Sequence, residues 1–376
     1  MLIRIFALGA GLATGPAPQF REHIIAEDLK GGYQVVAADL NGDRRPDLIA
    51  LASNLSELIW FENQGWQRHV IARGISSPIN LDLVHPGGGA PPVMVLATAF
   101  SMDPAKSIGI VHVLQPGKDI TQPWDIREID RLPTSHRIRF ADIDGSGRKV
   151  AVNAPLAGAL SAAPDYRDRV PLVFYRPGEW KRETISNDAD GVLHGIAIND
   201  WDNDKREEVL TASYLGIQVL KLGRDGRWRR TPIAAGDPAP WPKGGSSDIA
   251  VGRMGKGRFL CALEPWHGNQ VVVYREEAGK WERIVIDNSL DGAHALVAAD
   301  LNTDGVDEIV AGFRGKGGRT YIYTVDNPDA GKWSRRLLDE RMPAAACAAA
   351  DLNGDNRLDL ACIGASSLKW YENLGR

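Results

Sequence analysis

Cysteine is scarce in this sequence, since three residues in 376 cannot build a disulfide-based scaffold. We expect Cys261, Cys347 and Cys362 to be buried free thiols, because cysteine is a common small core residue. Cys347 and Cys362 should nevertheless lie on neighbouring strands of one hairpin, where a bridge can form. The low cysteine content therefore excludes a small disulfide-rich fold and favours an ordinary hydrophobic core.

Long apolar runs and an excess of basic residues are also missing. No run reaches the ~18 residues that a membrane-spanning helix needs, and no basic amphipathic stretch suits a membrane surface. The formal net charge is −4, with both signs interspersed, which argues against a nucleic-acid partner. The sequence therefore predicts neither a membrane nor a nucleic acid as a partner, and it carries no signal for an oligomeric state.

The first nineteen residues differ from the rest of the chain. A positive charge at Arg4 precedes an apolar segment at 5–12, and residues 13–18 are small and turn-prone. This order is typical of a short secretory signal. We expect residues 1–19 to be a signal peptide and the protein to be periplasmic or secreted. The alternative is a disordered N-terminal extension on a cytoplasmic protein.

What the sequence does contain is a repeat. Segment 35–50 reads VVAADLNGDRRPDLIA, and segment 347–361 reads CAAADLNGDNRLDLA. Aligned copies, two of them degenerate, recur about every fifty residues. Their anchor positions are Asp39, Val84, Asp142, Asp200, Gly252, Asp300 and Asp351. Such a period indicates an array of similar supersecondary units.

A second motif repeats out of phase with the first. A bulky aromatic residue is followed by basic residues and β-branched alternation, beginning at Phe20, Trp66, Trp124, Trp180, Trp228, Trp281 and Trp333. Each unit then holds four short strands, the pattern of a propeller blade. The sequence predicts an all-β, seven-bladed β-propeller over residues 20–376. The strand at 20–26 should complete the C-terminal blade and close the ring.

Four of the repeats carry oxygen-bearing side chains at positions 1, 3, 5 and 9 of a tight turn. Alternating oxygen ligands suit a hard cation, calcium better than magnesium. The alternative is an Asx turn without metal, because aspartate, asparagine and glycine favour turns. We expect structural cation sites at Asp39, Asn41, Asp43, Asp47; Asp200, Asp202, Asp204, Glu208; Asp300, Asn302, Asp304, Glu308; and Asp351, Asn353, Asp355, Asp359.

These loops resemble those of FG-GAP or VCBS-type repeat propellers. Segments 264–274 (EPWHGNQVVVY), 194–200 (HGIAIND) and 244–248 (GGSSD) are similar to the propeller domain of aldos-2-ulose dehydratase and its bacterial relatives. The resemblance to FG-GAP or VCBS-type repeats covers roughly residues 20–376. The narrower resemblance to the dehydratase propeller implies a metal-assisted elimination on a keto-sugar.

Aligning the repeats also reveals a set of histidines. The positions six residues before the anchors are Tyr33, Pro78, His136, His194, Ser246, His294 and Ala345. These positions should ring one mouth of the central channel, at the end of the innermost strands opposite the cation hairpins. Three converging imidazoles would suit a zinc-like ion with an open position, so we predict a channel metal site at His136, His194 and His294. Polar residues lining a wet channel are the alternative.

Loops between the second and third strands should open on the same mouth. His267 and Tyr214 are candidate general acids or bases there, and Arg314 could hold an anionic oxygen. Candidate substrate-binding residues are Asn153, Trp241, Glu264, Trp266 and Arg319. These residues favour a carbohydrate-active lyase or dehydratase acting on a small sugar or oligosaccharide.

Two other functions remain open. The first is a non-catalytic, calcium-stabilised propeller that binds a protein or glycan. The second is elimination on an acidic polysaccharide, which would need a basic groove across the face. The candidate groove residues are Arg137, Arg139, Lys243, Arg314 and Arg319.

Overall fold

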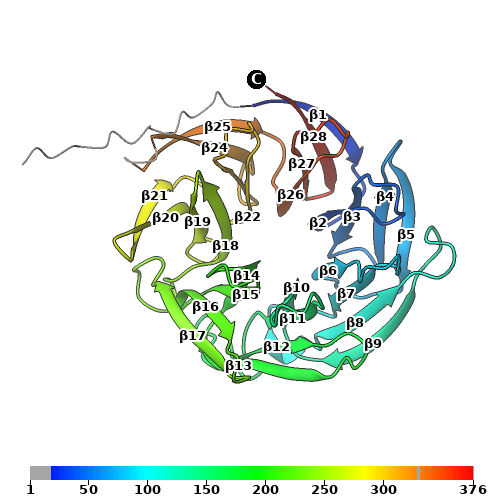
Figure 1. Cartoon of the computed structure of the whole chain (residues 1–376), viewed down its shortest axis with the longest axis horizontal. Coiled ribbons are helices and arrows are strands. Elements are labelled where there is room, and N and C mark those ends of the chain that lie inside the picture. Colours follow the sequence, from blue (N-terminus) through cyan, green and yellow to red (C-terminus); the bar gives the residue numbers. More distant parts are fainter. Residues whose placement is uncertain (1–17, 328–330, 376) are drawn as a thin grey trace, which may run out of the picture.

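The computed structural model describes residues 18–327 and 331–375, so most of the expected signal segment lies outside the described residues. Seven four-stranded antiparallel sheets surround a central channel (Figure 1). Within the described ranges the only helix is the short η1 (Pro104–Lys106). No helix there is long and apolar enough to cross a bilayer. The predicted all-β, seven-bladed propeller is confirmed.

The blades follow one another along the chain, and each runs from its innermost to its outermost strand. Blades 1 to 3 are β2 (Gly32–Ala38), β3 (Asp47–Ala52), β4 (Glu57–Glu62), β5 (Gln67–Arg73); β6 (Asn80–Val84), β7 (Val93–Thr98), β8 (Ile110–Gln115), β9 (Asp125–Arg131); and β10 (Ser135–Ala141), β11 (Val150–Pro155), β12 (Arg169–Tyr175), β13 (Arg182–Asp190). Blades 4 and 5 are β14 (Leu193–Asn199), β15 (Glu208–Ser213), β16 (Gly216–Leu222), β17 (Trp228–Ala234); and β18 (Asp248–Met254), β19 (Gly257–Glu264), β20 (Gln270–Glu277), β21 (Lys280–Asp287). Blades 6 and 7 are β22 (Ala293–Ala299), β23 (Glu308–Phe313), β24 (Thr320–Asn327), β25 (Lys332–Asp339); and β26 (Ala346–Ala350), β27 (Asp359–Gly364), β28 (Ser367–Gly375), β1 (Gln19–Ala26).

Burial along a blade explains its sequence pattern. The second strands β3, β7, β11, β15, β23 and β27 are buried at every position, because both of their faces pack against adjacent blades. The outermost strand β5 is instead exposed at Gln67, Arg68 and Arg73 and buried only at Ile71 and Ala72. Hydrophobic cores therefore lie between blades, where large side chains such as Trp60 and Tyr274 are fully buried.

The ring is closed by the two ends of the chain. Strand β1 pairs antiparallel with β28, with Phe20 opposite Asn373 and His23 opposite Trp370. In Figure 1 the blue β1 lies along the outer edge of the red blade. This arrangement is the predicted one, and it pairs the edge of β28 that would otherwise be open.

In five blades the aromatic–basic motif forms an ion pair with the preceding blade. In five copies the residue two positions after the tryptophan is an arginine that reaches an aspartate of the preceding blade; the pairs are Arg68–Asp28, Arg182–Asp130, Arg230–Asp188, Arg283–Asp237 and Arg335–Asp287. In blade 7 that position is Glu22, and Lys369 supplies the cation instead, 2.6 Å from Asp339 and 3.0 Å from Glu22. The motif therefore marks contacts between neighbouring blades as well as the outermost strand of each blade.

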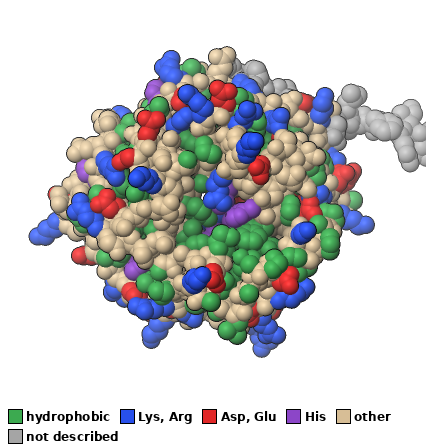
Figure 2. Space-filling view, turned by 180° about the vertical axis from the view of Figure 1, so that it is seen from behind, with side chains coloured by type: hydrophobic (Ala, Val, Ile, Leu, Met, Phe, Trp, Pro, Cys, Tyr) green, Lys and Arg blue, Asp and Glu red, His purple; other side chains and the backbone are tan. Residues whose placement is uncertain are grey.

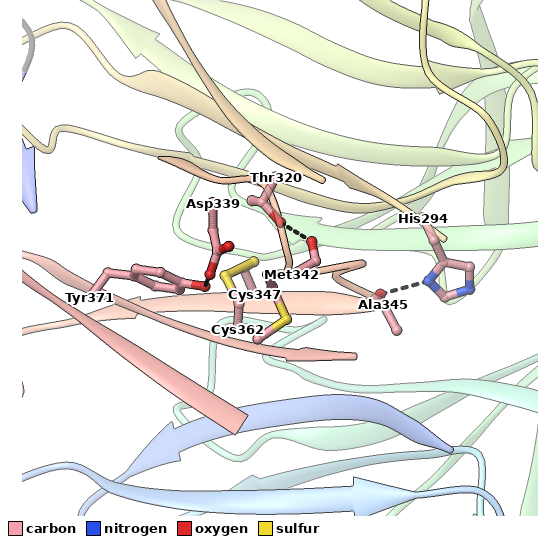
Figure 3. The surroundings of a disulfide bond; sticks show 8 residues. All are labelled: His294, Thr320, Asp339, Met342, Ala345, Cys347, Cys362 and Tyr371. Atoms are coloured by element: carbon pink, nitrogen blue, oxygen red, sulfur yellow. Dashed lines mark hydrogen bonds between the residues drawn. A yellow bond between two sulfur atoms is a disulfide. The ribbon is translucent and has the colours of Figure 1, made fainter. Parts of the chain in front are cut away.

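A disulfide joins the first two strands of blade 7. Cys347 on β26 and Cys362 on β27 are direct register partners, with Cα atoms 4.1 Å apart (Figure 3). The expectation of free thiols is therefore wrong for these two residues, because the antiparallel register brings their sulfur atoms together. It is confirmed for Cys261, which is buried and free.

Candidate functional site

Four histidines meet on the channel axis. His136, His194 and His294 lie at the starts of β10, β14 and β22 and are at most 3 % exposed. His267 joins them from the loop between β19 and β20, and its ring centroid lies 5.0 Å from that of His194 and 5.5 Å from that of His294. Figure 2, from the face turned away in Figure 1, shows histidine and basic side chains in a central hollow bordered by hydrophobic side chains.

Three of these imidazoles form the tightest group. Ligand-type nitrogens of His194, His267 and His294 all lie within 4.8 Å of one another. The Nδ1 atoms of His194 and His294 face the backbone oxygens of Ser247 (3.1 Å) and Ala345 (2.6 Å). An imidazole that donates from Nδ1 presents Nε2 as a ligand.

Unpartnered atoms support a metal in this place. The buried Nε2 of His294 has no hydrogen-bond partner among the described residues, and the Nε2 atoms of His194 and His267 are 3.3 Å apart. Three imidazoles whose ligand-type nitrogens lie this close together fit a zinc-like ion that keeps an open position. The residues present therefore fit the metal implied by the sequence.

His136 lies beside this group with a different set of contacts. Its ring centroid is 4.8 Å from that of His194, but its Nε2 lies 2.9 Å from the hydroxyl of Tyr33 and 3.3 Å from Arg137. The structure thus groups His267, which we singled out as an acid or base, with His194 and His294. His136 instead forms a hydrogen-bonded pair with Tyr33.

The cluster is electrostatically suited to remain neutral. Burial, followed by the charge of Arg137, holds the pKa of His136 and His194 well below the usual value; burial and then Arg314 do the same for His294. Burial, with Arg314 and Arg137, lowers the pKa of His267 to about 3. Neutral imidazoles are the form that binds metals.

Tyr33 was missed as a functional residue, although it stands at the same repeat position as the three histidines. Two guanidinium groups lie near its ring, with Arg137 5.7 Å and Arg314 5.8 Å from the centroid. Arg137 also lies 3.3 Å from the Tyr33 hydroxyl. Two fixed positive charges beside neutral imidazoles would stabilise an anionic oxygen in the hollow.

An aromatic wall borders the histidines. The ring of Tyr214 lies 5.0 Å from Trp241 and 6.0 Å from Trp266, and Trp266 lies 4.9 Å from His267. Tyr166 packs edge-on against Trp266 at 5.6 Å. The Trp266 indole nitrogen is buried without a partner among the described residues. The partly exposed faces of Trp241 and Trp266 suit stacking on a ring-shaped ligand.

Two predicted substrate-binding residues do not reach the hollow. Asn153 and Glu264 are fully buried inside blades 3 and 5. Glu264 accepts hydrogen bonds from Ser246 (2.5 Å), Tyr274 (2.7 Å) and Arg283 (2.8 Å). Both residues belong to the ends of strands β11 and β19 rather than to loops, so their side chains point into the blade and stabilise it.

The basic groove is not formed as expected. Arg137 is 5 % exposed, and Arg139 donates to Asn80 and to the backbone of Ile138. Both line a channel cavity of about 420 Å³ that also includes His294. Lys243, Arg314 and Arg319 remain exposed on the surface. Two of the five groove residues therefore lie inside the channel, where a polysaccharide cannot run across them.

The repeat loops form the opposite ends of the innermost strands. Asp39 Oδ1 accepts the amide of Gly42 (2.8 Å) and its Oδ2 accepts the amide of Arg44 (2.8 Å). The position-9 carboxylates accept a backbone amide of the same loop at 2.8–2.9 Å; they are Asp47, Glu208, Glu308 and Asp359. These bonds fix the turn. Oxygens of Asp200, Asp202 and Glu208 lie within 4.8 Å of one another.

Comparison with known proteins supports the family resemblance. Residues 109–277 match the aldos-2-ulose dehydratase β-propeller domain, and residues 300–362 match the FG-GAP-like repeat. Aldos-2-ulose dehydratase of Phanerodontia chrysosporium is 28 % identical over 264 residues, which is 61 % of this chain. The match covers only 28 % of that relative's length.

Two solved structures share the fold at low sequence identity. BBS1N in complex with ARL6DN has a TM-score of 0.59 and 13 % identity, and covers 96 % of this chain and 97 % of that one. A protein from Bacteroides uniformis, provisionally described as a 6-phosphogluconolactonase, has a TM-score of 0.52 and 12 % identity, and covers 92 % and 98 %. These likenesses support the propeller fold alone.

Proposed function

We propose that this protein is a carbon–oxygen lyase that carries out a metal-assisted β-elimination on a keto-sugar or related small sugar. The observation that supports it is the group of neutral imidazoles, His194, His267 and His294, within a hollow that has aromatic and cationic walls. The relative named aldos-2-ulose dehydratase supports the reaction class. A zinc-like ion held by these residues would polarise the sugar carbonyl and acidify the neighbouring C–H bond.

The remaining side chains have separate roles in this proposal. His136 takes the proton from the carbon next to the carbonyl at its Nδ1 atom while its Nε2–H donates to the Tyr33 hydroxyl, and the electrons of the broken C–H bond form the double bond. The C–O bond at the β-carbon breaks, and the leaving hydroxyl takes a proton to depart as water. Burial raises the pKa of Tyr214, so its hydroxyl stays protonated and is the donor. Arg314 holds the negative oxygen that develops, while Trp241 and Trp266 stack on the sugar.

His267 acts as a ligand in this scheme rather than as the base, because its Nε2 lies 3.3 Å from that of His194. Calcium in the repeat loops would stiffen the blades without taking part in the reaction. The Cys347–Cys362 disulfide supports a periplasmic or secreted location, because disulfides persist in oxidising compartments.

Elemental analysis of the purified protein is the first test. We compare wild type with a His194→Ala/His267→Ala/His294→Ala variant and with His85→Ala, an exposed histidine outside the cluster. One transition metal per chain, lost only in the triple variant while calcium is retained, is the expected result. Keto-sugar turnover should be lost with it.

Wild-type protein that contains calcium but no transition metal, and turns over no keto-sugar, would overturn the proposal. The hollow would then favour the second candidate, a non-catalytic propeller whose aromatic wall binds a glycan or protein. Titration with oligosaccharides, with Trp266→Ala as the variant that should lose binding, separates that case.

A further inference from the structure

One cation loop already contains a positive charge from the chain itself. The Nζ atom of Lys221, on β16, contacts Asp202 and lies 2.8 Å from Asp204 and 3.3 Å from Glu208. These three carboxylates are positions 3, 5 and 9 of the blade 4 loop. The ammonium group therefore lies where their oxygens converge, the place that a bound calcium ion would take.

The strand register identifies the corresponding residue in other blades. In blade 4, Val209 pairs with Leu220, so Lys221 is the next residue of the third strand. The equivalent pairs are Leu48–Phe61, Ile309–Tyr323 and Leu360–Tyr371 in blades 1, 6 and 7. The residues that stand at the position of Lys221 are then Glu62, Thr324 and Glu372. Only the blade 4 member of this set of four is a cation.

Blade 3 follows the same rule in a loop that has lost its ligands. Its pair Ala151–Tyr175 places Arg176 at the position of Lys221, and the guanidinium lies 4.0 Å from Asp144. Position 9 of that loop is Val150, which offers no oxygen. A basic residue therefore stands at this position of the third strand in two blades. In blade 3 the loop has lost its ligands, and in blade 4 the loop keeps them and the lysine contacts them.

Calcium does not fit the blade 4 loop while Lys221 is there. The ion would need to displace the Lys221 ammonium from Asp202, Asp204 and Glu208. In blade 1 the neighbouring group is the Glu62 carboxylate, which lies 3.1 Å from Asn41 and adds a negative charge. Opposite charges at one structural position change the affinity of otherwise matched loops.

We propose that Lys221 is the resident cation of blade 4, so that calcium binds in the loops of blades 1, 6 and 7 but not in the loop of blade 4. The repeat pattern alone predicts four calcium ions per chain, and the proposal predicts three. The proposal takes calcium binding in the other loops from that pattern and does not depend on the lyase reaction.

The test counts calcium ions bound per chain, by calorimetric titration of chelator-treated full-length protein with calcium alone. Wild type should bind three ions, and Lys221→Met, which keeps the aliphatic stem, should bind four. Thr324→Lys transfers the ammonium to blade 6 and should bind two. Lys280→Met, at an exposed lysine of β21, is the control and should bind three.

Four ions in wild type, or three in a folded Lys221→Met variant, would overturn the proposal. If Lys221→Met does not fold, the count for Thr324→Lys decides, since an unchanged count of three there also overturns it. Circular dichroism and the unfolding midpoint establish which variants are folded. A loss of keto-sugar turnover in any of these variants bears on the lyase proposal and not on this one.

Discussion

Each innermost strand begins at one kind of candidate site and ends at another, and β14 carries both. Near its start, β14 presents His194 to a cluster whose other members come from blades 3, 5 and 6. Its other end leads into the Asp200 loop, where the hydrogen bonds that shape the turn join residues of blade 4. A locally encoded site can be duplicated with its repeat, whereas an assembled site exists once and depends on the ring staying closed.

The largest expected effect is on turnover, and it distinguishes the histidine cluster from the repeat loops. His294→Ala should remove the channel metal and reduce keto-sugar turnover by about 10³-fold, the range for loss of an essential catalytic group. Asp43→Asn, at the loop end, should leave turnover unchanged. Steady-state kinetics with metal content measured on the same samples decides; equal turnover in wild type and His294→Ala would remove the distinction between the two ends.

Removing an ion pair between blades 6 and 7 should lower the stability of the closed ring, on which the histidine cluster depends. Lys369→Met leaves the buried Asp339 without its ammonium partner, which typically costs about 3 kcal/mol. Urea unfolding at neutral pH measures this loss. The control is Arg21→Met, because Arg21 is an exposed partner of Glu372 and should change stability little.

The same variant has a predicted pH dependence. Burial alone would raise the pKa of Asp339, but bonds from Lys369, the Arg341 amide and Tyr371 outweigh it and lower the pKa. A depressed pKa adds stability above the unfolded value and loses it as pH falls through the folded value. The difference between wild type and Lys369→Met should therefore shrink below about pH 4. A constant difference down to pH 3 would contradict the ion-pair explanation.

Removing calcium should lower the stability of the folded state through the repeat loops alone. A ligand at a hundred times its Kd stabilises the folded state by about 2.7 kcal/mol per site. Asp43→Asn should lose the share of one loop and keep the response of the others. Chelator titration followed by thermal unfolding checks this, and an unfolding midpoint that ignores calcium in wild type would count against all of the loops.

The smallest effect concerns the hydroxyl of Tyr33. Tyr33→Phe removes the partner of His136 Nε2 and should cost about 1–2 kcal/mol in transition-state energy, or roughly 5–30-fold in kcat. Metal content and KM should remain near wild type. A fall in metal content instead of kcat would assign Tyr33 to positioning the ligands.

The sequence predicted what repeats and little of what does not. The fold, the closure by β1 and the three ring histidines follow from spacing, because each blade repeats the same local pattern. His267 enters the same cluster from a loop that no repeat position marks, so only the closed ring brings it to His194. Glu264 was expected in a loop at the rim, but it is the last residue of β19 and is fully buried, where Ser246, Tyr274 and Arg283 donate to it. Lys221 escaped notice because its role depends on register across two strands.

The closure of the ring also sets a schedule for its synthesis. His23 and Glu372, which touch in the finished protein, are 349 residues apart in the chain. At about 5–20 residues per second, a ribosome needs roughly 17–70 s to make that interval. Throughout it the nascent β1 has no partner strand, and a translational stall late in the message would leave six complete blades with an open gap. The time for which this edge is exposed is when a chaperone would be most needed.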